Sequence, residues 1–352
     1  MRQPVTGPLA VTTVDYHAAG EPFRIVTGGV PAVLGASVLD RRAYAAEHLD
    51  AYRVLLAHEP RGHAGMYGCH VVPPDGEGAD LGVVFFHNEG YSTACGHGTI
   101  ALATWALDAG AVRRDDGGTT PVVIDAPSGR VTALARHDGE RVASVSFRNV
   151  PAFVDALGVT VTTPAGRRVP VDIAYGGAYY ASLPAEAVGL EVEPAHVRRF
   201  IDLGRAIKAE LARKGVARHP TDPRLSGVYG VVFFEERGTV GECLCQRSVD
   251  RAAVRQRNIT VFADGQVDRS PCGSGSSARL ALLHAAGRLR TGEPLIHESV
   301  VGTRFIARVV DEVQVAGRQA VVTEIEGSAY RTGEHRFVLD PRDELGEGFL
   351  LR

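Results

Sequence analysis

Short apolar runs rich in β-branched residues recur along the chain, separated by Gly, Pro and Asp. This alternation of brief apolar segments and turn residues predicts strands. In the first half of the chain the predicted strands are 10–17, 23–30, 66–72, 81–87, 121–126, 130–136 and 142–147. In the second half they are 171–176, 230–236, 259–263, 305–310, 320–327 and 337–340.

Helices are predicted at only four places. Residues 40–56 and 193–214 have the composition of helix formers, and two further runs follow Cys95 and Cys272. The last two runs are predicted to end at the Ala-Gly pairs whose glycines are Gly110 and Gly287, because glycine is the usual residue just past a helix end.

The helices after Cys95 and Cys272 begin with one shared motif. In "YSTACGHGTIALATWALDAG" (91–110) and "DRSPCGSGSSARLALLHAAG" (268–287), Cys-Gly-x-Gly precedes a hydroxyl residue, and Ala-Gly closes the stretch. One copy in each half of the chain predicts an α+β fold with two similar lobes. We expect the chain to cross from one lobe to the other within 124–134.

Length and charge narrow the classes of function. A chain of 352 residues suits two domains. Its formal net charge of −3 argues against nucleic acid or an anionic membrane as a partner. The N-terminal residues have no sustained apolar segment, and no apolar run is long enough to span a bilayer, so we expect a cytoplasmic protein.

The five cysteines are an odd number in a chain without an export signal, which argues against a disulfide framework. Cys243 and Cys245 are spaced to share one face of a strand, where both would behave as small apolar residues. The same interpretation holds for Cys69. No second cysteine pair is present to complete a zinc site.

Cys95 and Cys272 differ from the other three because each comes just before a helix. The unpaired N–H groups and the positive end of the helix dipole favour a thiolate or a bound carboxylate there. A single such cysteine is more often an inert buried thiol, and two inert thiols could be relics of duplication. Two copies instead suggest opposed sulfurs, one removing a proton from a carbon and the other delivering one to its opposite face.

The two motifs resemble the signatures of the proline racemase family, which includes proline racemase, 4-hydroxyproline epimerase and trans-3-hydroxyproline dehydratase. The resemblance rests on "CGHGTI" and "DRSPCGSGSSA". It extends to "DYHAAGEPFRIVTGG", "PRGHAGMYG", "HNEGYS", "FRNVPAF" and "DIAYGGAYYA". It implies a diaminopimelate-epimerase-like fold of two pseudo-symmetric lobes, each a mostly antiparallel sheet wrapped around a central helix. The expected lobes are 1–127 with 333–352, and 128–332.

The resemblance also assigns roles to seven residues. It identifies Cys95 and Cys272 as the two catalytic bases. It places His97 and Asp268 where the family holds the ring nitrogen of the substrate. The backbone expected to hold the substrate carboxylate is that of Gly96, Gly273 and Ser274. The implied partner is a small molecule, proline or hydroxyproline, with no cofactor and no metal, and the family often forms homodimers.

The resemblance leaves the reaction open. In dehydratase-like members the second cysteine is replaced by threonine, so Cys272 favours an epimerase. Against this, "HNEGYSTACGH" and "DRSPCGSGSSAR" are closer to dehydratase-like members, and Ala94 replaces the methionine common before the first cysteine. We therefore expect a two-base epimerase acting on hydroxyproline or proline. The alternatives are trans-3-hydroxy-L-proline dehydratase and a non-catalytic imino-acid-binding or thiol-redox protein.

Overall fold

The computed structural model describes residues 9–237 and 253–351, which divide into two compact units. Within these residues, unit 1 consists of 9–147 with 328–351, and unit 2 of 148–237 with 253–327. The prediction for Cys243 and Cys245 lies outside the described residues. Cys69, Cys95 and Cys272 form no disulfide with one another.

Unit 1 is built from strands around one buried helix. Its strands pair in the order β18-β1-β2-β3-β4-β6-β7, and only the β2–β3 and β4–β6 pairs are parallel. A parallel pair needs a crossover connection, which α1 and α2 supply for the first pair and α3 for the second. The elements are β1 (Leu9–Ala18), β2 (Glu21–Gly28), α1 (Val38–His48), α2 (Asp50–Ala57), β3 (Tyr67–Val72), β4 (Leu81–His87), β5 (Gly90–Tyr91), α3 (Gly96–Asp108), β6 (Thr119–Ala126), β7 (Gly129–Asp138), β8 (Arg141–Arg148) and β18 (Ala329–Leu339).

Unit 2 repeats this plan. Its strands pair in the order β9-β10-β11-β12-β13-β15-β16-β17, and here the β11–β12 and β13–β15 pairs are parallel. The helix α4 makes the first crossover and α5 the second. The elements are β9 (Phe153–Thr162), β10 (Arg168–Tyr175), β11 (Tyr179–Pro184), η1 (Ala185–Val188), η2 (Pro194–His196), α4 (Val197–Lys214), η3 (Pro223–Leu225), β12 (Val228–Glu236), β13 (Val254–Phe262), β14 (Gln266–Asp268), α5 (Gly273–Ala285), β15 (Pro294–Ser299), β16 (Arg304–Val315) and β17 (Arg318–Gly327).

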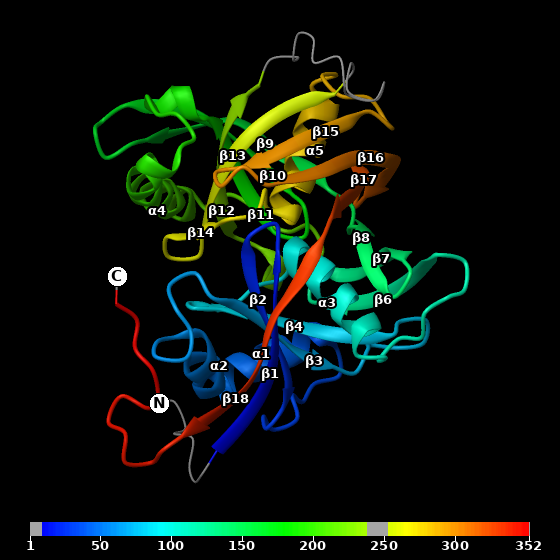
Figure 1. Ribbon diagram of the computed structural model, residues 1–352. Helices are drawn as coiled ribbons and strands as arrows, with labels where there is room; N and C mark the ends of the chain where they lie inside the picture. Colours follow the sequence, from blue (N-terminus) through cyan, green and yellow to red (C-terminus); the bar gives the residue numbers. More distant parts are fainter. Residues whose placement is uncertain (1–8, 238–252, 352) are drawn as a thin grey trace. The chain divides into compact units, whose positions relative to one another are not determined.

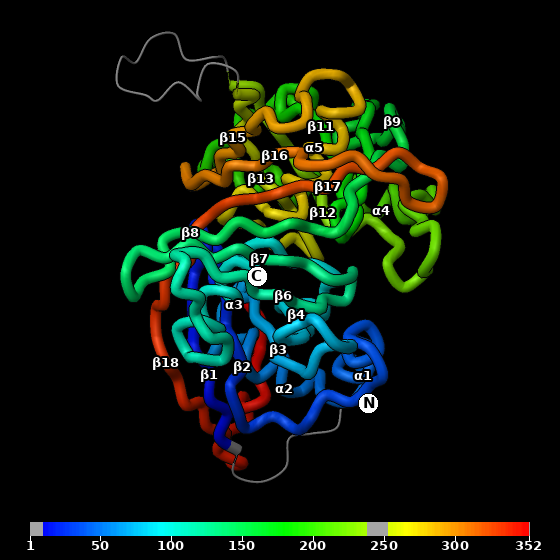
Figure 2. Tube along the Cα trace, turned by 90° about the vertical axis from the view of Figure 1, so that its right-hand side faces the viewer, coloured from blue at the N-terminus to red at the C-terminus, as the bar shows by residue number. Residues whose placement is uncertain are grey.

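The equivalent helices α3 and α5 are the centres of their units. Helix α3 contacts β1, β2, β6, β7 and β18, and α5 contacts β9, β10, β11, β16 and β17. Figure 1 shows α3 in cyan and α5 in gold among these strands, and Figure 2 shows β16 and β17 running side by side. Both helices are almost wholly buried. The predicted α+β fold with a sheet around a central helix is confirmed.

Two predictions about single elements are wrong. Residues 40–56 form two helices because Leu49, with φ −120° and ψ 11°, interrupts the helical backbone between α1 and α2. Residues 124–134 are not a crossing between lobes. They form the β6–β7 hairpin, in which Ala126 pairs with Gly129 across a two-residue turn. A Pro-Ser-Gly sequence is well suited to such a tight turn.

The hairpin also explains where unit 1 ends. Because β7 pairs with β6 from Gly129 to Arg136, the chain remains in unit 1 beyond the expected boundary of 127/128, and unit 1 extends to Phe147. The return to unit 1 comes at Ser328, five residues before the expected 333, because β18 pairs with β1 from Ala329 onward. Across 9–237 and 253–351, none of the helices combines the length and the apolarity needed to cross a membrane.

Candidate active site

The first predicted cysteine lies at the start of α3 in unit 1. Cys95 is the residue that caps the helix, with extended backbone angles of φ −153° and ψ 104°. Its sulfur accepts a hydrogen bond from the Gly98 amide at 3.2 Å, and its side chain is buried with the residue only 5% exposed. The sulfur thus occupies the position in which a helix N-terminus stabilises negative charge.

Gly98 leaves the space that this sulfur occupies. A Cβ atom added at Gly98 would lie 2.7 Å from Cys95 Sγ and 2.4 Å from a ring carbon of Phe23. The equivalent glycine in unit 2 has the same role, since a Cβ at Gly275 would lie 2.9 Å from Cys272 Sγ. The second glycine of each Cys-Gly-x-Gly motif therefore gives the sulfur access to the first helical turn.

His97 lies directly against the Cys95 sulfur. Its ring nitrogens are 3.4 and 3.5 Å from Sγ, and the residue is buried. The rings of Phe23 and Tyr67 pack edge-on against the imidazole, at centroid distances of 5.8 and 4.9 Å. Phe23 and Tyr67 come from two of the sequence stretches that carry the family resemblance. Those stretches fix the orientation of His97.

The second predicted cysteine caps α5 in unit 2 with a different backbone conformation. Cys272 has φ 64° and ψ 100°, a left-handed conformation that a residue with a Cβ rarely adopts. A short chain of hydrogen bonds holds it there. The Cys272 amide donates to Ser270 Oγ at 3.1 Å, and Ser270 donates through its amide and its hydroxyl to Asp268 Oδ1 at 2.8 and 2.7 Å.

Burial changes the acidity of both Asp268 and Cys272. Desolvation raises the pKa of Asp268 to about 6, although the hydrogen bonds from Ser270 act in the opposite direction. Burial also raises the pKa of the Cys272 thiol, and the nearby Asp268 carboxylate raises it further. Cys272 is therefore a thiol at neutral pH in the substrate-free protein, which is the form that delivers a proton.

Tyr180 is a neighbour of Cys272 that sequence reasoning did not identify. Its hydroxyl lies 3.6 Å from Cys272 Sγ and 2.7 Å from Ser274 Oγ, and all three residues are buried. Tyr180 belongs to the stretch "DIAYGGAYYA", which carries the family resemblance. Tyr180 lies outside the predicted strands, and a tyrosine by itself gives no sign of its chemistry, so the sequence alone could not distinguish Tyr180 from the adjacent Tyr179.

Two polar networks brace the first turn of α5. Asn149 donates to the Gly176 carbonyl at 2.8 Å and to Ser277 Oγ at 2.9 Å. On another side, His297 lies 2.7 Å from both Ser276 Oγ and Asn258 Nδ2. Every member of these networks is buried, and such fully bonded networks fix one geometry in a core.

The seven residues predicted for the site thus form one group in each unit. Unit 1 brings together Cys95, Gly96 and His97 at the start of α3. Unit 2 brings together Cys272, Gly273 and Ser274 at the start of α5, with Asp268 joined to them through Ser270. All seven are buried, and each group combines a sulfur, a helix N-terminus and a titratable side chain.

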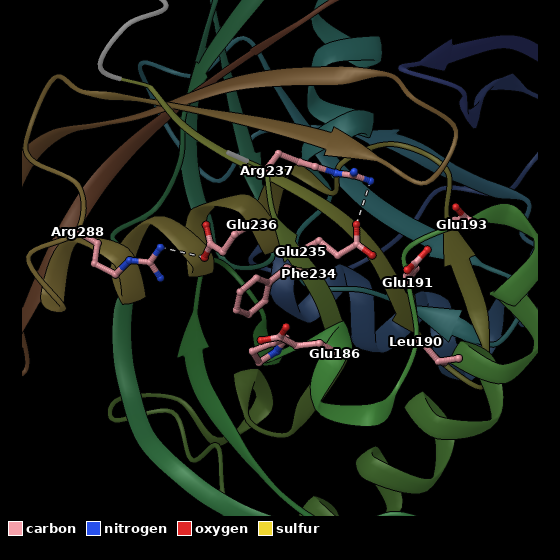
Figure 3. A pocket seen from close by; sticks show the side chains of 10 residues that line it. Glu186, Leu190, Glu191, Glu193, Phe234, Glu235, Glu236, Arg237 and Arg288 are labelled. Carbon is pink, nitrogen blue, oxygen red and sulfur yellow. Dashed lines mark ion pairs between the residues drawn. The ribbon is translucent and has the colours of Figure 1, made fainter. Parts of the chain in front are cut away.

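A cavity elsewhere in unit 2 is not part of this arrangement. It has a volume of about 600 Å³ and is lined by residues of η1 and of the end of β12. Figure 3 shows the side chains that line it. Five glutamates line it, and two of them form 3.0 Å ion pairs, Glu235 with Arg237 and Glu236 with Arg288. None of the seven predicted residues lines this cavity, and ion pairs already use part of its charge.

Comparison with known proteins agrees with the predicted family. Residues 13–350 match the family model for proline racemase. Trans-3-hydroxy-L-proline dehydratase from Bacillus cereus is 45% identical over 340 residues, which cover 97% of this chain and 98% of that protein. The 3-hydroxyproline 2-epimerase of Burkholderia multivorans is 43% identical over 350 residues, with coverage of 97% and 98%.

A solved structure agrees as well. The hydroxyproline epimerase from Agrobacterium vitis, crystallised with bound trans-4-OH-L-proline, has a TM-score of 0.89 and 31% identity, and the match covers 97% of this chain and 95% of that one. The names of these relatives are those of isomerases and hydro-lyases, the two classes of enzyme predicted from the sequence. The chain belongs to the proline racemase family.

Proposed function

We propose that this protein is a cofactor-independent epimerase that inverts the α carbon of hydroxyproline or proline, with Cys95 and Cys272 as the two acid–base groups. One observation carries the proposal. Each unit places a cysteine sulfur at the start of its central helix, and both helices have the same length of 13 residues. A protein that needed only one base would have no use for the second sulfur.

The chemistry is a proton transfer at each face of one carbon. The thiolate of one cysteine takes the Cα proton, and the thiol of the other delivers a proton to the opposite face. Charge that develops on the substrate carboxylate as the Cα proton leaves would be stabilised by the amides at the two helix starts, around Gly96, Gly273 and Ser274. General acid–base catalysis of this kind typically contributes factors of about 10² to 10⁴ in rate.

His97 and Asp268 are proposed to bind the ring nitrogen of the substrate. In its anionic form Asp268 would pair with a protonated secondary amine, and the positive charge of that amine would in turn lower the pKa of Asp268 from its raised value. A cationic nitrogen next to the α carbon also acidifies the Cα–H bond. The bound substrate would therefore supply the positive charge that pairs with the buried Asp268 carboxylate.

The names of the relatives favour 3-hydroxyproline over other prolines as the substrate. Both the Bacillus cereus and the Burkholderia multivorans relatives are named for 3-hydroxyproline, while the Agrobacterium vitis structure contains the 4-hydroxy isomer. We propose a hydroxyproline substrate on this ground.

The protein is further proposed to act as a homodimer, which light scattering coupled to gel filtration can test.

The same relatives support a second candidate, dehydration of trans-3-hydroxy-L-proline. There one cysteine would remove the Cα proton while the 3-hydroxyl group leaves with a proton as water, and the unsaturated ring would rearrange to an imine. This reaction needs no acid on the far face of the α carbon. The cysteine at position 272, beside Tyr180 and Asp268, favours the epimerase because it supplies that acid.

Incubation in D₂O with L-proline, trans-4-hydroxy-L-proline and trans-3-hydroxy-L-proline separates the candidates. The epimerase incorporates deuterium at Cα and inverts it, which NMR and chiral chromatography detect. The dehydratase converts the 3-hydroxy substrate to an imine, which can be trapped chemically, without accumulating an epimer. Binding of these compounds with neither exchange nor dehydration would instead indicate a non-catalytic imino-acid-binding protein.

A further inference from the structure

The hydroxyl of Tyr180 bridges two groups at the start of α5. It lies 2.7 Å from Ser274 Oγ and 3.6 Å from Cys272 Sγ. Tyr180 is on β11, is 1% exposed, and packs edge-on against Tyr229 at a centroid distance of 5.9 Å. Since packing holds its ring, this hydroxyl has one fixed position with two hydrogen-bond partners, each able to donate or accept.

We propose that Tyr180 is a further catalytic residue, whose hydroxyl works with Ser274 as a reversible hydrogen-bond relay that follows the proton on Cys272. The inference rests on the proposed function, in which Cys272 alternates between thiolate and thiol. It adds a residue and a direction of hydrogen bonding that the family resemblance does not supply.

The relay needs only rotation of O–H bonds. When Cys272 is a thiolate, the Tyr180 O–H donates to Sγ and the Tyr180 oxygen accepts from the Ser274 hydroxyl. When Sγ has taken a proton from Cα, its S–H donates to the Tyr180 oxygen, and the Tyr180 O–H turns to donate to Ser274 Oγ. The transferred proton stays on sulfur, tyrosine keeps its own proton, and no heavy atom has to move.

The surroundings keep Tyr180 in the neutral form that this relay requires. Burial raises the pKa of Tyr180, and the nearby Cys272 thiolate raises it further. The hydrogen bond from Tyr180 acts in the opposite direction on the sulfur, lowering the pKa of Cys272 against the effects of burial and Asp268. Tyr180 therefore favours the thiolate form of Cys272 and itself stays protonated.

The two sulfurs have different neighbours, which makes the inference specific to one face of the substrate. Cys95 lies against the His97 imidazole and accepts from the Gly98 amide. Cys272 lies beside the Tyr180 hydroxyl. Loss of the Tyr180 hydroxyl should therefore slow proton transfer between Cys272 and the α carbon, and leave removal of the Cα proton by Cys95 unchanged.

The test compares Tyr180→Phe with Tyr179→Phe. Tyr179 is the adjacent residue on the same strand, is fully buried, and its hydroxyl has no hydrogen-bond partner among the described residues. Deuterium uptake at Cα is measured from each epimer separately, and Cys272→Ala identifies the epimer whose exchange depends on Cys272. For that epimer Tyr180→Phe should slow exchange by about tenfold or more, the usual effect of losing a hydrogen bond to a charged group.

The pH profile and the control complete the expected result. In Tyr180→Phe, the rise of the exchange rate with increasing pH should shift to higher pH for that epimer. The exchange rate of the opposite epimer should change by less than about twofold. Tyr179→Phe should match the wild type in both directions. Ser274→Ala, which removes the other hydroxyl of the relay, should lower the exchange rate of the same epimer. Its effect should not add to that of Tyr180→Phe in the double variant.

A second readout does not depend on turnover. Alkylation of Cys272 by iodoacetamide, followed by peptide mass spectrometry, should show a midpoint at higher pH in Tyr180→Phe than in Tyr179→Phe. Equal alkylation midpoints in Tyr180→Phe and Tyr179→Phe would overturn the relay. Equal losses of exchange rate from the two epimers in Tyr180→Phe would also overturn it. A wild-type protein without exchange on any substrate would instead overturn the proposed function, and the alkylation midpoints would then decide the relay independently.

Discussion

The amide of Gly98 donates to the sulfur of Cys95 at 3.2 Å, and the same glycine leaves the space in which that sulfur lies. The glycine three positions after each cysteine thus lets the cysteine side chain fold back over the first turn of its own helix.

Substitution of Gly98 by alanine should displace the Cys95 sulfur. The added Cβ would lie 2.7 Å from Sγ and 2.4 Å from Phe23, and both contacts are too close to be kept. We expect a rate of inversion lower by about 100-fold, since a displacement of about 1 Å at a reacting group has effects of that size. Gly117→Ala is the matched control, because a Cβ there meets nothing within 4 Å. Equal rates in the two variants would show that the glycine does not position the sulfur.

Asp268→Asn should make stability less dependent on pH. The pKa of Asp268 is about 6 in the folded protein, above its ordinary value of 3.8, so its ionisation opposes folding. Its favourable contribution is complete below pH 3.8 and is lost as the pH rises through 6. Asparagine keeps an oxygen to accept from Ser270 but cannot ionise.

The unfolding free energy of the wild type, measured relative to Asp268→Asn, should therefore fall by about 2.4 kcal/mol between pH 4 and pH 7, at up to about 1.4 kcal/mol for each pH unit between the two pKa values. Urea denaturation of both proteins across this range measures the difference. Parallel curves for the two proteins would mean that Asp268 is not desolvated as described.

His297→Ala should destabilise unit 2. Because an amide nitrogen can only donate, Asn258 Nδ2 donates to His297 Nε2, and His297 Nδ1–H donates to Ser276 Oγ. Burial lowers the pKa of His297 to about 3, so the ring stays neutral. The substitution removes one hydrogen bond from each of these two buried partners and leaves a cavity, at a cost of about 3 to 4 kcal/mol in unfolding free energy. The exposed His63→Ala should cost less than about 0.5 kcal/mol, and a similarly small loss for His297→Ala would contradict this account.

The repeated motif allowed the central helices to be predicted closely from sequence. Both helices start one residue after the cysteine and run for 13 residues, and Gly110 and Gly287 follow them with φ of 68° and 66°. Local signals suffice here because the end of each helix requires a left-handed backbone conformation, which glycine adopts most readily. The strands β9, β11 and β15 were missed. The sequences of β11 and β15 show no clear alternation, and β9 alternates only over 159–162.

The side-chain environment of the site could not be predicted in the same way. Ser270 and Tyr180 act through contacts that depend on the backbone turn at Cys272 and on the packing of β11 against α5. The left-handed conformation of Cys272 has no local sequence signal, since the equivalent Cys95 is extended. Identical motifs therefore led to two different sulfur environments, which only the tertiary structure distinguishes.

The most direct test of the account measures Cα deuterium exchange and inversion from each epimer in D₂O, for the wild type, Cys95→Ala, Cys272→Ala and Cys69→Ala. The account predicts that Cys95→Ala and Cys272→Ala each lower the rate of inversion by about 100-fold or more. Each of these two variants should keep exchange from only one epimer, and the epimer should differ between them. Cys69→Ala, which removes a buried thiol on β3, should invert at the wild-type rate. Undiminished inversion in Cys95→Ala or Cys272→Ala would contradict the two-base mechanism.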